Sequence, residues 1–139
     1  MDKLTLIIPA KNEKESLPKV LEDLKKYNLN IIIILEKSDS ETIQAVKDYE
    51  SQICYQKNKG YGDALIEGIN SVRTDYFCIF NADGSFRSDE LTKMYEKLEN
   101  ENKDFIFGSR YEKNSSSEDD TIVTYVGNII LSLIGKIFF

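Results

Sequence analysis

Short apolar runs alternate with helical patterns along most of the chain, and this alternation constrains the fold more than any other feature. A short apolar run that is stopped by turn residues predicts a buried strand. Such runs occupy residues 4–8, 31–35, 52–56, 76–80 and 105–107. Strands that alternate with helices predict an α/β fold with a doubly wound, mainly parallel sheet and flanking helices.

Apolar residues recur at helical spacing between these runs, which predicts a helix after each of the first four strands. Residues 38–41 are suited to cap the second helix, residues 60–72 form the third, and Ser88 lies at the start of the fourth. The predicted inward faces are Leu17, Val20, Leu21 and Leu24, then Ile43, Val46 and Tyr49, and finally Leu91, Met94, Tyr95 and Leu98.

The composition excludes several kinds of chemistry. The chain has no histidine, which excludes a histidine general base, a Ser-His-Asp triad and histidine-bound zinc. The chain has 18 basic and 24 acidic residues, for a formal charge of −6, so no nucleic acid partner is expected. The first strand is followed by no G-x-G-x-x-G, and no G-x-x-x-x-G-K-[ST] occurs, which disfavours dinucleotide-binding and P-loop domains.

The cysteines and the start of the chain predict a location. Cys54 and Cys78 lie in strand-like runs, where reduced cysteine behaves as a small hydrophobe. The first residues lack the basic region and long apolar core of a secretory signal. We therefore expect a cytoplasmic domain.

Polar loops follow three of the predicted strands, at residues 9–13, 36–40 and 81–85. In open parallel sheets, ligands bind beyond the carboxyl ends of the strands. These loops are therefore expected to surround a binding site at one edge of the sheet.

Four segments resemble those of family-2 glycosyltransferases, which have the GT-A fold. In chain order they read IPAKNEKESL, NKGYGDALIEGI, FNADGS and DFIFGSRY, and the match runs over residues 4–111. The sequence looks most similar to the dolichol- and undecaprenyl-phosphate sugar transferases. This resemblance implies a GT-A-like sheet, a nucleotide-sugar donor and transfer of a hexose.

The resemblance implies a donor site built from four loops. Lys11 stands where an aromatic residue is frequent in the family, and Lys37 stands where the family has a second acid. Helix capping by residues 12–13 and 38–41, or simple turns at the glycines, are the alternative explanations. The implied donor-binding residues are Pro9, Ala10, Asn12, Glu13, Glu36, Asn58, Gly60, Gly62, Ala82 and Asp83.

The triplet at residues 81–83 occupies the position of the family's D-x-D motif, whose carboxylates hold a metal. By resemblance, Asp83 and Asn81 would bind Mg²⁺ or Mn²⁺, with Asn81 replacing a carboxylate. Arg110 is the implied partner of an acceptor phosphate. The acids at residues 118–120 align with no motif, so no catalytic base is assigned.

The last segment has a different composition. Residues 122–139 are mostly apolar, with Thr124, Asn128, Ser132 and Lys136 forming a polar stripe on a helix. We expect a nucleotide-sugar-binding domain over residues 1–120, which looks incomplete, and an amphipathic, membrane-interfacial helix over residues 121–139. A core helix is the alternative.

The resemblance thus implies an inverting, metal-dependent hexosyltransferase that uses a UDP- or GDP-sugar. Its acceptor would be polyprenyl phosphate, and its location peripheral to the inner face of the cytoplasmic membrane. A nucleotide-sugar-binding domain without activity is the alternative, and a nucleotidyltransferase is a weaker one. The sugar, base, acceptor and oligomeric state stay open.

Overall fold

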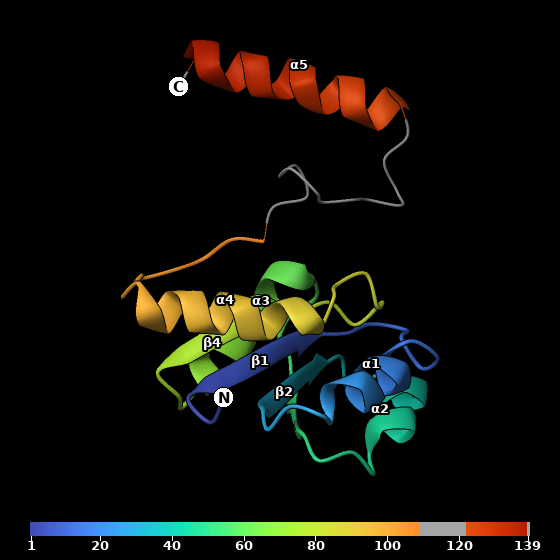
Figure 1. Ribbon diagram of the computed structural model, residues 1–139. Coiled ribbons are helices and arrows are strands. Elements are labelled where there is room, and N and C mark those ends of the chain that lie inside the picture. The colour runs from blue at the N-terminus through green and yellow to red at the C-terminus, as the bar shows by residue number, and fades with distance from the viewer. Residues whose placement is uncertain (109–121, 139) are drawn as a thin grey trace. The chain divides into compact units, whose positions relative to one another are not determined.

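The computed structural model of the protein describes residues 1–108 and 122–138 (Figure 1). The chain divides into two compact units, Met1–Asn102 and Lys103–Phe139. The first unit contains the sheet with four helices, and the described part of the second contains one helix. The predicted boundary at residue 120 stays a prediction.

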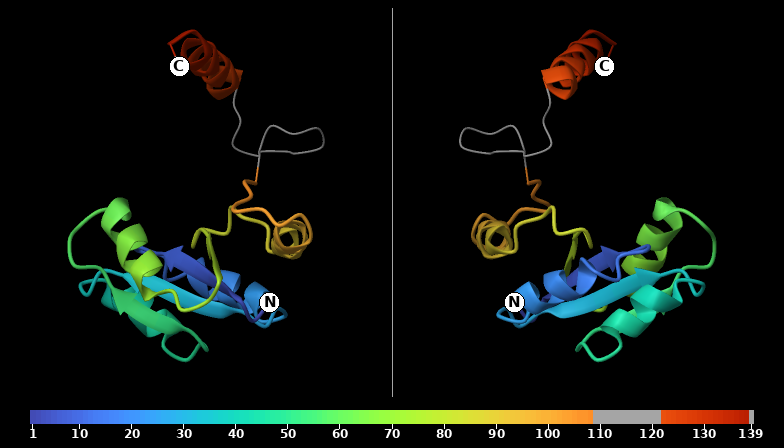
Figure 2. Two further views of the ribbon diagram at one scale, coloured as in Figure 1. Left: turned by 90° about the vertical axis from the view of Figure 1, so that its left-hand side faces the viewer. Right: turned by 90° about the vertical axis from the view of Figure 1, so that its right-hand side faces the viewer.

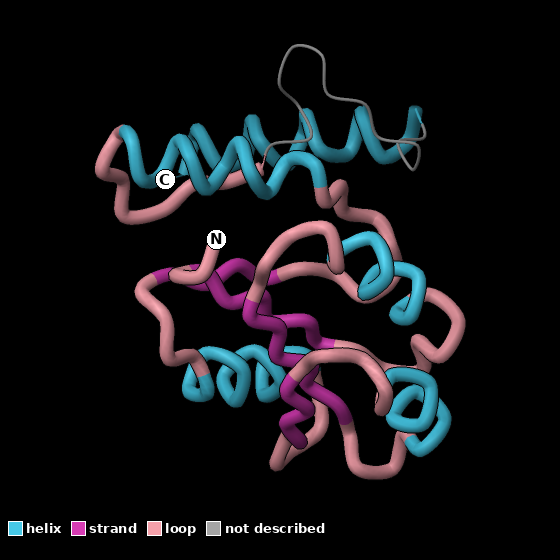
Figure 3. Tube along the Cα trace, turned by 60° about the horizontal axis from the view of Figure 1, so that its bottom comes forward, coloured by secondary structure: helices cyan, strands magenta, loops and turns pink. Residues whose placement is uncertain are grey.

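Four parallel strands form the sheet of the first unit, and Figure 3 shows them lying side by side. They are β1 (Leu4–Pro9), β2 (Asn30–Leu35), β3 (Gln52–Tyr55) and β4 (Tyr76–Ile79). Their order is β3-β2-β1-β4, and the register sets Ile7 beside Ile32 and Ile79. The predicted α/β fold with a parallel sheet is confirmed, as are the first four predicted strands.

Four helices follow these strands: α1 (Leu17–Leu24), α2 (Ser40–Val46), α3 (Tyr61–Ser71) and α4 (Asp89–Asn100). The four predicted inward residues of α1 are all buried. Helix α2 ends at Val46, so Tyr49 lies beyond the helix that was predicted to include it, although its ring still packs against the core. Tyr49 is therefore part of the core packing although it is not part of a helix.

Alternating side chains give the sheet two apolar faces. Leu6, Ile8, Ile33 and Leu35 point to the face that α1, α2 and α4 cover. Ile7, Ile32 and Ile34 point to the opposite face, against Ala64 of α3. Figure 2 shows α3 and α4 on opposite sides of the sheet. Because every residue of β1 is buried, the loop after it starts from a fixed point.

Residues 105–107 do not form the predicted fifth strand. They have no regular secondary structure, and the Phe105 and Phe107 side chains are 68% and 83% exposed. A strand is stable only where partners satisfy its backbone hydrogen bonds. Among the described residues, no strand pairs with this segment, so its three apolar residues were an insufficient signal.

Helix α5 (Ile122–Phe138) belongs to the second unit. Of the predicted polar stripe, Asn128 is half-buried and Ser132 and Lys136 are exposed, while the Thr124 side chain and residues 114–120 lie outside the described residues. Nowhere in the described ranges is a helix both long and apolar enough to cross a bilayer. The exposed apolar side chains of α5 are Val126, Ile129, Ile130, Leu131, Leu133 and Ile134.

Candidate functional site

Loops from all four strands meet at a cleft of about 320 Å³ beyond the carboxyl ends of the sheet. The parallel arrangement brings these ends to the same edge, where ligands of such sheets bind. Its volume lies at the lower end of the range for small-molecule sites. The lining residues are Pro9, Ala10, Lys11, Glu13, Glu36, Gln56, Gly60, Tyr61, Ala64, Asn81, Ala82 and Asp83.

The loop after β1 is held against the start of α2. Asn12 has a left-handed backbone (φ 59°), and its N–H donates to the Asp39 carboxylate at 2.7 Å. Asp39 also caps α2 by accepting from the Thr42 N–H at 3.2 Å, and the Thr42 hydroxyl accepts from the Glu13 N–H at 3.0 Å. Asn12, a predicted donor ligand, does not line the cleft; its backbone anchors the loop.

These contacts change the acidity of Asp39. Partial burial raises the pKa of its carboxyl, but hydrogen bonds from the Asn12 N–H and from Thr42 outweigh this, and the net pKa is lowered. The capping residue is therefore held as a carboxylate.

Glu36, at the end of β2, forms an ion pair within the cleft. The Lys11 ammonium donates to its Oε1 at 2.7 Å, and the Ser38 hydroxyl donates to its Oε2 at 3.3 Å. The hydrogen bond from Lys11 is the main cause that lowers the pKa of Glu36. The Glu36 side chain is only 16% exposed, whereas that of Lys11 is 63% exposed.

The segment before α3 is organised by Asp63. Its carboxylate accepts from the N–H groups of Lys57 and Asn58 at 3.0 and 2.9 Å, and from the Asn58 amide at 2.9 Å. The Asn58 amide therefore points to Asp63, and Asn58, like Gly62, does not line the cleft. Gly60 lines it with a φ of 110°, which favours glycine.

Four lining residues were missed from the sequence: Lys11, Gln56, Tyr61 and Ala64. Gln56 directly follows β3 and Tyr61 opens α3. The available signal for Gln56 was a polar side chain directly after a strand, as Glu36 is directly after β2. Lys11 had been noted only as a departure from the family.

The loop after β4 orients Asp83 and Asn81. The Asp83 carboxylate accepts from the Ser85 N–H at 2.9 Å, and the Asn81 amide donates to the Ser85 hydroxyl at 3.1 Å. Gly84 takes a φ of 81°, and the Phe86 ring packs edge-on against Phe80 with centroids 5.6 Å apart. The turn is thus shaped by local contacts on both sides of Asp83.

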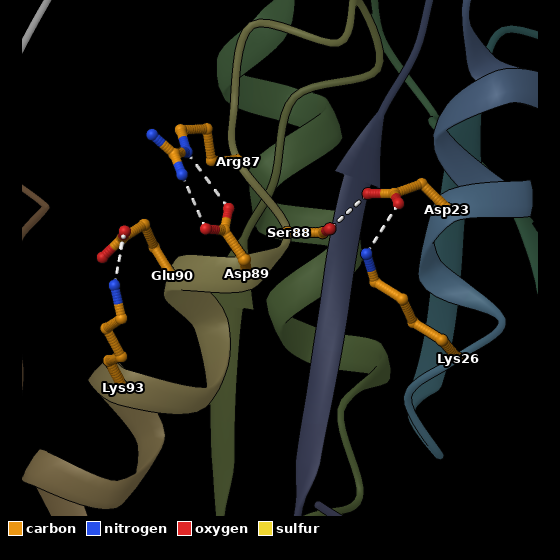
Figure 4. A network of polar contacts seen from close by, with 7 residues as sticks. All are labelled: Asp23, Lys26, Arg87, Ser88, Asp89, Glu90 and Lys93. Carbon is orange, nitrogen blue, oxygen red and sulfur yellow. Dashed lines mark hydrogen bonds and ion pairs between the residues drawn. The ribbon is translucent and has the colours of Figure 1, made fainter.

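A polar brace holds the far end of this loop between α1 and α4. The Ser88 hydroxyl donates to Asp23, which also accepts from Lys26 at 2.8 Å (Figure 4). Arg87 binds Asp89 through two hydrogen bonds of 3.1 and 2.7 Å. Ser88 was predicted as a capping residue, but its side chain makes no capping bond and serves this brace instead.

A second cleft of about 320 Å³ shares Asp83 with the first. It is lined by Ser16, α1 and the loop after β4, so it lacks the contributions from the ends of β2 and β3 that the first cleft combines. Its lining consists of Ser16, Lys19, Val20, Asp23, Phe80, Asp83, Gly84 and Phe86.

Two residues of the first cleft fit a divalent cation whose remaining ligands come from a bound molecule. An Asp83 carboxylate oxygen and the Asn81 amide oxygen are of the type that Mg²⁺ and Mn²⁺ prefer. In the described part of the chain, no three acidic or cysteine side chains gather into a metal cage. A cation held here would need further ligands such as phosphate oxygens. Arg110 and the acids at 118–120 lie outside the described residues.

The structure is an α/β domain with a cleft at the carboxyl edge of its parallel sheet. The profile of glycosyl transferase family 2 matches residues 5–133, and the chain belongs to that family. A mannosyl-3-phosphoglycerate synthase from Rubrobacter xylanophilus shares the GT-A-like fold, with a TM-score of 0.60 at 14% identity over 69% of this chain and 36% of that one.

Two curated relatives act on dolichol-linked phosphates according to their names. The UDP-N-acetylglucosamine–dolichyl-phosphate N-acetylglucosaminyltransferase of Methanococcus voltae is 30% identical, with 96% of this chain and 62% of the relative covered. The dolichol-phosphate mannosyltransferase of Pyrococcus furiosus is 28% identical, with 84% and 36% covered. The chain therefore spans less than two thirds of the length of either relative.

Proposed function

We propose that the chain carries the donor-binding part of an inverting glycosyltransferase that moves a hexose from a UDP- or GDP-sugar to polyprenyl phosphate. The observation that carries this proposal is the cleft itself, to which all four strand ends contribute. It combines an ion pair between the loops after β1 and β2 with Asp83 in the loop after β4. The names of the two relatives, which include dolichyl or dolichol phosphate, support the class of acceptor.

The donor diphosphate belongs at the β4 end of the cleft in this proposal. Asp83 and Asn81 would hold Mg²⁺ or Mn²⁺ there, and the bound cation would stabilise charge on the leaving nucleoside diphosphate. The turn through Gly84 and the bond from the Ser85 N–H keep the Asp83 carboxylate oriented before the donor arrives. The predicted donor residues that line the rest of the cleft, namely Pro9, Ala10, Glu13, Glu36 and Gly60, would support the nucleotide along the β1, β2 and α3 loops.

The acceptor would approach from the membrane side. A phosphate monoester is already ionised at neutral pH, so its attack on the anomeric carbon needs no general base. Inversion follows from a single in-line displacement. Arg110 is proposed to pair with the acceptor phosphate, and the apolar face of α5 to lie at the surface of the membrane.

Calorimetric titration tests the donor site. UDP, GDP and their hexose conjugates are titrated with and without Mn²⁺ into the protein and into Asp83→Ala. We expect metal-dependent binding that weakens at least about tenfold in the variant, because an anionic ligand of the cation is lost.

Asp75→Ala is the matched control, because Asp75 is exposed and precedes the same strand at its opposite end. It removes the same charge and should bind like the parent protein. Equal weakening in both variants, or no binding by folded parent protein, would refute the donor site.

Donor binding without turnover is the second candidate function. Two residues favour it. Asn81 is a neutral ligand, and Lys37 places an ammonium, 5.9 Å from the Tyr55 ring centroid, where the family has a second acid. A full-length protein that binds donor but transfers no sugar to dolichyl phosphate would support it.

A further inference from the structure

The loop after β4 contains an exposed segment between two buried residues. Ala82 and Ser88 are 4% and 5% exposed, whereas residues 83–87, termed the arch, are all exposed. Asp83 is the first residue of the arch, so the position of its carboxylate depends on how the two ends are held. A short segment with both ends fixed has few conformations, and release of one end gives it many more.

The two ends of the arch are held in different ways. Ala82 packs in the apolar core on the side of the sheet that α1 covers. The Ser88 hydroxyl instead donates to Asp23 of α1, which lies 65 positions earlier in the chain (Figure 4). Hydrogen bonds from Lys26 and from Ser88 lower the pKa of the Asp23 carboxyl, so the acceptor is ionised at neutral pH. The far end of the arch thus depends on a polar contact with another element.

A hollow separates the arch from α1. The second cleft lies between them, and its lining includes Val20 and Asp23 of α1 and Asp83 and Phe86 of the arch. The Phe86 ring packs edge-on against Phe80, which supports the arch from the end of its own strand. Because a hollow provides fewer packing contacts than a filled interior, the contact between the arch and α1 at Ser88 gains importance.

The hydrogen bond between Asp23 and Ser88 also connects two loops of the first cleft. The loop after β1 lines that cleft and leads into α1, which carries Asp23. The loop after β4 lines it as well and leads through Ser88 into α4. The hydrogen bond therefore fixes the two loops relative to each other, although neither Asp23 nor Ser88 lines the first cleft.

We propose that Asp23 and Ser88 are positioning residues for the divalent cation: their hydrogen bond holds the arch so that the Asp83 carboxylate is already in place when the cation binds. This inference rests on the proposed donor site and adds to it two residues outside the first cleft. Without the hydrogen bond, the arch loses conformational entropy as the cation binds, which weakens binding. Groups that orient metal ligands typically change metal affinity roughly 10–100-fold.

Charge is the competing explanation for any effect of Asp23. Asp23 lines the second cleft together with Asp83, so its negative charge would also attract a cation. Two variants separate these explanations. Asp23→Asn removes the charge but keeps an acceptor oxygen for the Ser88 hydroxyl, whereas Ser88→Ala keeps the charge and removes the hydrogen bond.

Equilibrium dialysis of UDP and GDP at increasing Mn²⁺ concentrations measures the effect. In Asp23→Ala and Ser88→Ala, the Mn²⁺ concentration that gives half of the maximal binding should rise about tenfold, the lower end of the range for such groups. In Asp23→Asn it should stay within about threefold of the parent value, because the hydrogen bond is kept. Circular dichroism verifies that each variant is folded.

The amount of nucleotide bound at saturating Mn²⁺ distinguishes positioning from a general structural defect. We expect this amount to equal that of the parent protein in every variant, because the sheet and the other loops of the first cleft are unchanged. A partly unfolded variant would instead bind less nucleotide at every Mn²⁺ concentration.

Glu22→Ala is the matched control. Glu22 is the neighbouring acid on α1, it forms an ion pair with Lys25 at 2.6 Å, and it lines neither cleft. This variant removes the same charge from the same helix and should keep the Mn²⁺ dependence of the parent protein.

Three results would overturn the inference while leaving the donor site intact: a parent-like value in Ser88→Ala, a value in Asp23→Asn as high as that in Asp23→Ala, or an equal rise in Glu22→Ala. Failure of the folded parent protein to bind either nucleotide, or binding that does not depend on Mn²⁺, would instead refute the proposed donor site.

Discussion

Asp39 connects two loops through a single carboxylate. It accepts from the Thr42 N–H to cap α2 and from the Asn12 N–H to hold the loop after β1 in its left-handed turn. From the sequence, Asp39 was either a cap or part of the site, and both explanations remained open. In the structure Asp39 caps α2. It also holds the Asn12 backbone, but it does not line the cleft itself.

Replacing Asp39 with alanine is therefore expected to cost stability. The free energy of unfolding should fall by about 1–2 kcal/mol, the usual effect of losing a helix cap. Asp39→Asn should lose less, because its amide oxygen can still accept the capping bond. Urea unfolding at neutral pH measures both variants.

Asp48→Ala is the control for this comparison, since Asp48 is an exposed acid just after α2. It should leave the unfolding midpoint almost unchanged. If Asp39→Ala unfolded at the same urea concentration as Asp48→Ala, the connecting role of Asp39 would be wrong.

At the scale of the element, α3 approaches the sheet closely through Gly68. A Cβ added at Gly68 would lie 2.4 Å from Ile7 Cγ2 and 3.3 Å from Ile34 Cγ1. Both isoleucines are fully buried strand residues, and β-branched side chains have few alternative rotamers. The contact therefore leaves no room for a larger residue without moving the helix.

Gly68→Ala should lower the free energy of unfolding by about 1–3 kcal/mol, the cost of overpacking a tight core. Gly62→Ala, in the first turn of the same helix, meets no atom within 4 Å. It should be neutral or stabilising by up to about 1 kcal/mol, because alanine favours helix. Chemical unfolding of the two variants checks the pair, and equal effects would contradict the packing of α3.

The elements differ in how well their sequences predicted them. The apolar patterns of β1 and α1 agree with burial: β1 was predicted to within one residue, and all four predicted inward residues of α1 are buried. Residues 105–107 have an equally apolar pattern but no described partner strand, and strand formation depends on that partner. Local patterns therefore predicted the buried elements, and they failed at residues 105–107, where strand formation depends on a partner strand.

The same limit applies to the candidate site. Glu36, Asn81 and Asp83 lie together because parallel strands end at one edge, which the sequence could predict. The bond between Lys11 and Glu36 joins residues 25 positions apart, and no local pattern indicates it. Asn58 has the expected position, but its contact with Asp63 directs its side chain away from the predicted role.

At the scale of the whole molecule, several carboxyl groups share one direction of pKa shift. The contacts of the folded chain lower the pKa values of Asp23, Glu36, Asp39, Asp63 and Asp89. A carboxyl whose pKa is lower in the folded than in the unfolded state adds stability above its unfolded pKa. That stability is lost as the pH falls through the folded pKa.

The unfolding midpoint in urea should therefore stay nearly constant from about pH 7 to pH 5 and fall below about pH 4, where unfolded carboxyls begin to bind protons. Replacing Asp39 and Asp63 together with asparagine should make this fall shallower, because two of the groups no longer titrate. Midpoints measured across this range provide the check. A midpoint that rises with acid would contradict the shared direction of the shifts.

The polar side chains that line the cleft take no part in either apolar core. The strands pack against the helices, but the polar residues that follow them do not belong to either core. These residues are Lys11, Glu36, Gln56 and Asp83. Substitutions at these positions leave the packing of the fold almost untouched. Descendants of one ancestral domain could therefore exchange one nucleotide for another without any compensating change inside the protein, and ligand preference can diverge much faster than the architecture that presents it.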